Sequence, residues 1–166
     1  MVILPGSIAL RELRVENLTQ SINSYVNSSI ITEVRTCHVH YIHTKRELSQ
    51  GTKEKLDLLL KYDTPLDLND SLSLKLSQIV KDDQVSLDND TYLFRILPRP
   101  GTISPWSSKA TNIVEVCGLN SEIERVERGV AVLLQVRQGF PLLDFINNDK
   151  TQCLTSIFDR MTEKLY

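Results

Sequence analysis

The sequence predicts a mixed α/β (α+β) fold in which two halves, related by a pseudo-twofold axis, share one helix-covered sheet. Two observations predict it. A strand–helix–strand–helix order recurs along the chain, and corresponding positions of the halves, such as Val34 and Val126, are a constant 92 residues apart (34 to 126). Such mixed periodicity is typical of layered α/β proteins. We expect one domain over residues 1–166, with repeats at about 1–62 and 91–166 joined by a connector at about 63–90.

The first half begins with apolar residues at helical spacing between 18 and 26 and then alternates between 37 and 42. The alternation is typical of a strand whose two faces differ. Helical spacing returns at 56–60, and Pro65 prevents that helix from continuing. The first half is therefore predicted to contain a helix, a strand and a second helix after the N-terminal segment.

The second half follows the same order. Residues 92–96 alternate as a strand that ends at Pro98 and Pro100. An amphipathic helix with a buried apolar stripe is predicted next, closed by Gly118; its stripe is Ala110, Ile113, Val114 and Cys117. A long apolar strand is expected at 126–136. A last helix is predicted from Leu154, Ile157, Phe158 and Met161.

The connector is acidic and carries one short apolar stripe, Leu72, Leu76, Ile79 and Val80. Its aspartates lack the spacing of a calcium-binding loop, which alternates acidic ligands and ends in a distal glutamate. We interpret the connector as a solvated linker with a single helix.

Composition excludes several classes of protein. Lys and Arg number 19 against 21 Asp and Glu, a net charge of −2, which provides no excess of cations for nucleic acid. No apolar run approaches the ~20 residues of a membrane-spanning helix, and no signal-like leader opens the chain. Three widely spaced cysteines suit a reducing cytoplasm. We therefore expect no nucleic-acid or membrane partner and a cytoplasmic location.

Possible metal ligands and nucleophiles occur near residue 40. In a strand, His38 and His40 share one face while Cys37 and His43 lie on the other, so three of them do not converge on a zinc ion. We interpret the histidines as partly exposed strand residues. Cys37, Cys117 and Cys153 are interpreted as core or surface thiols, because no basic partner is specified for any of them.

The charged segment 122–128 alternates acids and arginines around Ile123 and Val126. Paired carboxylates can perform acid–base chemistry, but the neighbouring arginines predict an ion-paired strand edge instead. The chain contains no phosphate-binding glycine loop and no nucleophile-elbow motif. We predict no catalytic residue in this chain.

The segment Pro98–Thr111 is the most distinctive, with three prolines, Gly101, three serines and Trp106 in 14 residues. Ser104 and Pro105 predict a capped helix start. Free N–H groups there, with Arg99 and Lys109, could alternatively hold an anion such as a substrate phosphate. Capping alone leaves the rest of the segment unexplained, which favours a docking or substrate-proximal loop formed by Arg99, Thr102, Ser104, Trp106, Ser107 and Lys109.

This segment, together with Cys117-Gly118-Leu119 and residues 123–129, resembles the N-terminal region of the phosphoribosylformylglycinamidine synthase family, also called FGAM synthetases or FGAR amidotransferases. Residues 4–15 and 159–163 extend the resemblance over nearly the whole chain. The resemblance implies a fused dimer of the small subunit found in multi-component bacterial forms of the enzyme. It also implies synthetase and glutaminase domains downstream, on the same polypeptide, as partners.

The resemblance further implies that the parent enzyme is a ligase using ATP, magnesium and glutamine-derived ammonia to convert formylglycinamide ribonucleotide to its amidine in purine synthesis. The present chain would bind no cofactor itself and would act as a non-catalytic scaffolding domain. The alternative from the residues alone is a regulatory module that binds a small ligand in a cleft between its α/β halves.

Overall fold

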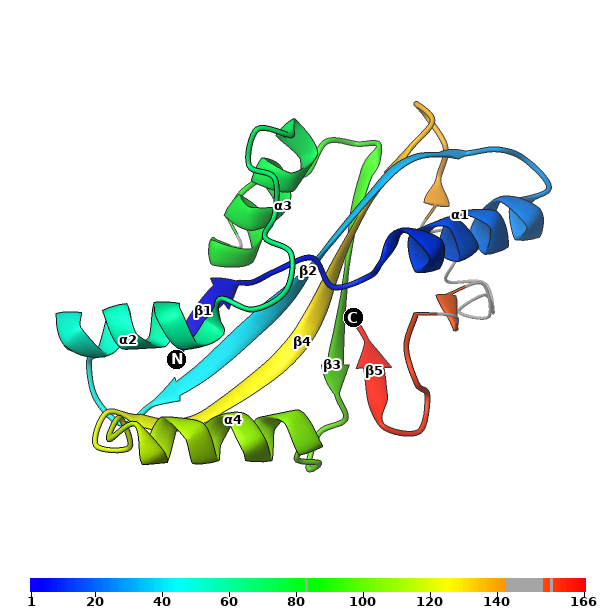
Figure 1. The fold of residues 1–166 in the computed structure, drawn as a ribbon. Helices are drawn as coiled ribbons and strands as arrows, with labels where there is room; N and C mark the ends of the chain where they lie inside the picture. Colours follow the sequence, from blue (N-terminus) through cyan, green and yellow to red (C-terminus); the bar gives the residue numbers. More distant parts are fainter. Residues whose placement is uncertain (83, 143–153, 156) are drawn as a thin grey trace.

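The computed structural model describes residues 1–82, 84–142, 154–155 and 157–166. Within them, antiparallel strands form one five-stranded sheet in the order β1-β2-β4-β3-β5. The long strands β2 (Ile31–Thr44) and β4 (Ile123–Val136) cross the centre (Figure 1). Strand β1 (Val2–Pro5) flanks β2, and β3 (Thr91–Pro98) and β5 (Glu163–Leu165) follow β4. The predicted mixed α/β class is confirmed.

The two central strands pair in a register that places His38 opposite Val130. These residues are 92 apart in sequence (38 to 130), and shifting the bounds of β2 by the same number gives those of β4. Helices α1 (Glu12–Val26) and α4 (Pro105–Val116) correspond in the same way within two residues. The predicted spacing therefore matches these element bounds. That the halves superpose, and that they resemble a fused dimer, stays a prediction.

The helices of both halves lie on one face of the sheet, as expected for a helix-covered sheet. α1 buries Leu18 and Ile22 over one end of β2 and β4. α2 (Gln50–Leu60) and α4 cover the other end, where Leu56 and Val114 pack with Val126. The alternation of the strands explains this arrangement, because alternate side chains of β2 and β4 point to opposite faces.

The opposite face is covered by the connector helix α3 (Ser71–Lys81), so the prediction of a solvated linker is wrong for this segment. Its cap, Asp70, accepts hydrogen bonds from Ser73 N at 2.9 Å and from Arg35 Nε at 2.8 Å. The Arg35 guanidinium and the Ser73 bonds hold the pKa of Asp70 well below its usual range. These contacts fix the helix on β2, where it buries the predicted stripe Leu72, Leu76, Ile79 and Val80.

Residues 61–70 connect helices on opposite faces and therefore pass around the edge strand β1. A backbone hydrogen bond from Ile8 N to Thr64 O, 2.9 Å, joins this passage to the segment after β1. An exposed sheet edge invites pairing with another chain. The passage lies beside the chain that continues from this edge, at Ile8.

The last predicted helix is wrong where the structure describes it. Residues 157–162 form a bend and turns, and β5 follows. The Asp159 carboxylate accepts hydrogen bonds from Met161 N and Thr162 Oγ1, both 2.9 Å. Such local side-chain bonds compete with helix formation, and Met161 is exposed rather than buried. Within the predicted span, residue 156 lies outside the described residues.

Candidate functional site

α4 begins as its sequence predicts. Ser104 Oγ accepts a hydrogen bond from Ser107 N at 3.0 Å, and Pro105 occupies the first turn. Before it, Gly101 adopts a φ of +82°, the left-handed conformation that favours glycine. These features fix the position of Trp106 at the start of the helix.

Ser104 and Ser107 also bind the helix to β4. Ser107 Oγ donates to Val126 O at 2.7 Å and accepts from Arg125 Nε at 3.0 Å. Ser104 Oγ donates to Glu127 Oε1 at 2.6 Å, and Arg125 pairs with the same carboxylate at 2.9 Å. Burial alone would raise the pKa of Glu127, but its hydrogen bonds from Ser104, the Arg128 backbone and Arg125 outweigh burial and lower it. The predicted ion pair is confirmed here, but β4 lies between β2 and β3, so the prediction of a strand edge is wrong.

Trp106 joins three other side chains in what we call the aromatic–arginine cluster: His40 of β2, Tyr62 after α2, and Arg128 of β4. The His40 ring centroid lies 5.6 Å from those of both Trp106 and Tyr62. The Arg128 guanidinium carbon lies 4.8 Å from the Trp106 ring centroid, within cation–π range. The cluster therefore joins both halves at one place.

Hydrogen bonds connect the polar groups of the cluster in series. Arg128 Nη1 donates to Tyr62 Oη at 3.4 Å, and Tyr62 Oη lies 2.6 Å from His40 Nε2. Burial, followed by the positive charges of His38 and Arg128, lowers the pKa of His40 to about 4, so the ring is neutral at pH 7. Since a guanidinium can only donate, the tyrosine proton is free for Nε2, and we assign the imidazole proton to Nδ1.

The structure separates the six predicted loop residues into two groups. Ser104, Trp106, Ser107 and Lys109 belong to α4 and its cap. Arg99 instead donates through Nε to Arg160 O at 2.9 Å, and Thr102 Oγ1 donates to Arg99 O at 2.6 Å. The predicted anion site combines Arg99 with the N–H groups at the helix start. The Arg99 guanidinium donates to the Arg160 carbonyl instead of pointing to such a site. A capped helix is the better interpretation of the helix start.

Several of these residues also have structural contacts that the sequence-based interpretation did not give them. Ser107 is buried in the network with β4, and Arg99 and Thr102 stabilise the turn. Trp106 is half-buried and packs against the core around Val126. The premise that capping leaves these residues without a structural role is therefore wrong, whereas their docking role stays a prediction.

The predicted buried stripe of α4 is only half buried. Val114 is 4% exposed, but Ile113 is 51% exposed and Cys117 is also on the surface. α2 does not cover them, and a groove of about 240 Å³ lies between the two helices. We call it the α2–α4 groove; its walls include Leu59 and Leu60 of α2, Tyr62, and Trp106, Lys109 and Ile113 of α4.

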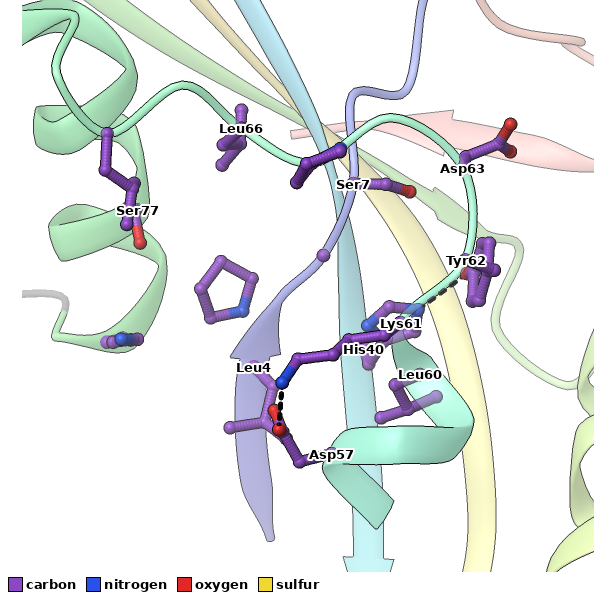
Figure 2. Close-up of a pocket in the computed structure, with 15 residues that line it drawn as sticks. Leu4, Ser7, His40, Asp57, Leu60, Lys61, Tyr62, Asp63, Leu66 and Ser77 are labelled. Atoms are coloured by element: carbon purple, nitrogen blue, oxygen red, sulfur yellow. Dashed lines mark hydrogen bonds and ion pairs between the residues drawn. The ribbon is translucent and has the colours of Figure 1, made fainter. Parts of the chain in front are cut away.

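A second cavity, of about 500 Å³, lies between β1, the connector and α3, and we call it the β1 cavity. Figure 2 shows Leu4, Ser7, Leu66 and Ser77 around it, with His40 bonded to Tyr62. Ser7 Oγ and His40 Nδ1 are buried without a hydrogen-bond partner in the described structure. Buried polar atoms are rarely left unpaired. Tyr62 lines both this cavity and the α2–α4 groove.

The histidines and cysteines are placed partly as expected. His38 and His40 share a face, but His40 is fully buried, so the prediction of partly exposed histidines is wrong for it. The described residues contain no cluster of three possible metal ligands. Burial raises the pKa of Cys37 to about 12, which leaves it an unreactive core thiol. Cys153 lies outside the described residues.

Tyr62 and Arg128 are the members of the cluster that sequence reasoning missed. Tyr62 follows a predicted helix and belongs to no motif. Arg128 was assigned to the ion-paired edge, although Glu127 pairs with Arg125 instead. Its signal was its place in the segment 123–129 that carries the family resemblance.

No helix among the described residues has the length and apolar character needed to cross a membrane.

Comparisons with known proteins find a matching family model and sequence relatives. Residues 37–166 match the family model described as formylglycinamide ribonucleotide amidotransferase N-terminal. The chain is also similar to phosphoribosylformylglycinamidine synthase of Saccharomyces cerevisiae, with 48% identity over 169 residues. That alignment covers 99% of this chain and 12% of the yeast protein.

Proposed function

We propose a docking function for this chain, which belongs to the formylglycinamide ribonucleotide amidotransferase N-terminal family: it positions other domains of the same polypeptide. The observation that carries the proposal is the uncovered apolar stripe of α4 beside a half-buried tryptophan. Aromatic residues and arginines dominate the binding energy of protein interfaces, and exposed apolar patches often mark them.

The enzyme that the domain would serve is, in this proposal, the ligase of purine synthesis that converts formylglycinamide ribonucleotide to its amidine. ATP and magnesium would be bound by a synthetase domain, and a glutaminase domain would supply ammonia. The name of the yeast relative supports this reaction. A cytoplasmic location, in which Cys37 and Cys117 stay free thiols, is part of the proposal.

Cleavage of the full-length enzyme tests the docking function. A specific protease sequence placed after Tyr166 would separate this domain from the rest of the polypeptide without removing it. We expect the cleaved domain to stay bound in size-exclusion chromatography and glutamine-dependent synthesis to continue. Once the bound domain has been removed, synthesis with glutamine should fall more than synthesis with added ammonia. Immediate separation of the two pieces after cleavage would disprove docking.

A second candidate function, binding of a small regulatory ligand, is favoured by the two unpartnered polar atoms at the β1 cavity, Ser7 Oγ and His40 Nδ1. A saturating ligand stabilises a protein by about 2.7 kcal/mol at one hundred times its dissociation constant. Under the docking function, ATP with magnesium leaves the melting temperature of residues 1–166 unchanged. A rise of several degrees that Ser7→Ala abolishes would support the ligand module.

A further inference from the structure

The guanidinium of Arg128 is held in place but has no acidic partner within the described part of the chain. The Trp106 ring lies beneath it at 4.8 Å, and the guanidinium donates a long hydrogen bond, 3.4 Å, to Tyr62 Oη. Among the described residues no carboxylate forms an ion pair with it, because the neighbouring Glu127 bonds to Arg125 and Ser104. An arginine fixed by stacking loses little entropy when a carboxylate binds its planar donors.

The α2–α4 groove lies beside this guanidinium, since Tyr62 and Trp106 belong both to its walls and to the cluster. Lys109 is the charged residue among the groove's lining side chains, and the remaining contacts are mainly apolar. Ile113 and Leu59 expose 51% and 36% of their surface at its rim. One surface therefore offers an apolar slot next to positive charge.

We propose that Arg128 and the α2–α4 groove form one binding site for an acidic, apolar segment of the same polypeptide that lies outside residues 1–166. The segment presents a carboxylate to the Arg128 guanidinium and inserts an apolar side chain beside Ile113. This inference rests on the proposed docking function and specifies the chemistry of the partner.

Two observations select this occupant. The positive charges of Arg128 and Lys109 complement an acidic partner, and charge complementarity sets which partner an interface accepts. The yeast relative is also much longer than this chain, which matches 12% of its length, so the relative contains ample polypeptide to supply such a segment. The segment acts within one molecule, where a high effective concentration supports binding at a small site.

The test uses the full-length enzyme with the protease sequence after Tyr166. After cleavage, the enzyme is captured through a tag at the start of the domain, and release of the remaining polypeptide is timed. Three variants are compared with the wild type: Arg128→Glu, Ile113→Asp and, as a matched control, Arg14→Glu. Arg14 is an exposed arginine of α1, located 92 residues before Trp106, and lies outside the groove and the cluster.

We expect Arg128→Glu and Ile113→Asp each to accelerate release at least about tenfold, as loss of an interface hot spot does, and Arg14→Glu to leave it unchanged within about twofold. Because Ile113 is half exposed, its variant should fold even if reversal of charge at Arg128 lowers stability. Wild-type release rates in both groove variants would overturn the inference and leave docking intact. Immediate release from the wild type would instead overturn the docking function.

A photoreactive residue at position 113 of the intact enzyme identifies the occupant. The expected cross-link joins the same polypeptide beyond residue 166, at a segment that contains an aspartate or glutamate. A cross-link to residues 1–166 of a second molecule would show that the groove is an interface between copies and would overturn the inference.

Discussion

Helices α1 and α4 correspond at the spacing of 92 residues, yet they are used differently. α1 has no side-chain cap, and the side chains facing the sheet, Leu18 and Ile22, are almost completely buried. α4 has a serine cap bonded to β4, a half-buried tryptophan and an exposed Ile113. The position of Arg128 corresponds to Thr36, which is buried and accepts a hydrogen bond from Leu10 N. In the first half α1 covers the core, whereas in the second half α4 leaves apolar side chains exposed at the surface.

The largest difference is expected between Leu18→Ala and Ile113→Ala. Leu18 is fully buried, so its truncation should lower the free energy of unfolding by about 2–5 kcal/mol, through lost burial and the cavity left behind. Ile113 is half exposed, and its truncation should cost under about 1 kcal/mol. Urea unfolding of both variants measures the two losses. Equal losses would show that α4 is as firmly packed as α1.

A large effect of pH is expected at His40, which β2 contributes to the cluster. Its pKa is lowered from 6.5 to about 4 in the folded chain, so the unfolded chain binds a proton first as pH falls. Stability is therefore lost between about pH 6.5 and pH 4, by about 3 kcal/mol from this residue. His40→Gln should remove that share of the loss in unfolding titrations, whereas the exposed His43→Gln should keep it. An unchanged pH dependence in His40→Gln would contradict the prediction.

A smaller loss is expected for Ser107→Ala, which breaks the attachment of α4 to β4. The variant leaves Val126 O and Arg125 Nε without the hydroxyl, and an unpaired buried polar group costs about 1–3 kcal/mol. Ser108→Ala is the matched control, because that hydroxyl is exposed and makes only a 3.4 Å contact. Thermal melts of the two variants should differ by several degrees. Coincident melts would mean that the buried network contributes nothing.

The smallest effect is expected for Arg99→Gln. Arg99 is exposed, and its bonds to Arg160 O lie in solvent, where a hydrogen bond contributes little net stability. The melting temperature should stay within about 1 °C of the wild type. A fall comparable with that of Ser107→Ala would show that the turn at 99–102 is a main support of α4.

Sequence reasoning predicted the elements with strong local signals. The cap at Ser104 and the alternation of β2 depend on neighbouring residues alone. The predictions failed where contacts between residues far apart in sequence determine which side chains are buried. The apolar spacing of Ile113 resembles that of a core residue, but its exposure depends on where α2 lies. The role of α3 depends on a sheet face that only the assembled strands create.

The cluster was predictable in part for the same reason. Trp106 belongs to an unusual segment, so composition alone singled it out. Tyr62 and His40 become partners through a contact between residues 22 apart, and Arg128 contacts Tyr62 from 66 residues away. No local pattern encodes such proximity, and the burial of His40 required the structure.

Tyr62 separates the β1 cavity from the α2–α4 groove, because it lines both of them. A shift of the Tyr62 side chain toward one of these spaces would change the volume of the other. A protein segment in the groove and a small molecule in the cavity would both contact Tyr62. Any coupling between them must act equally in both directions, so that each occupant changes the affinity for the other by the same factor.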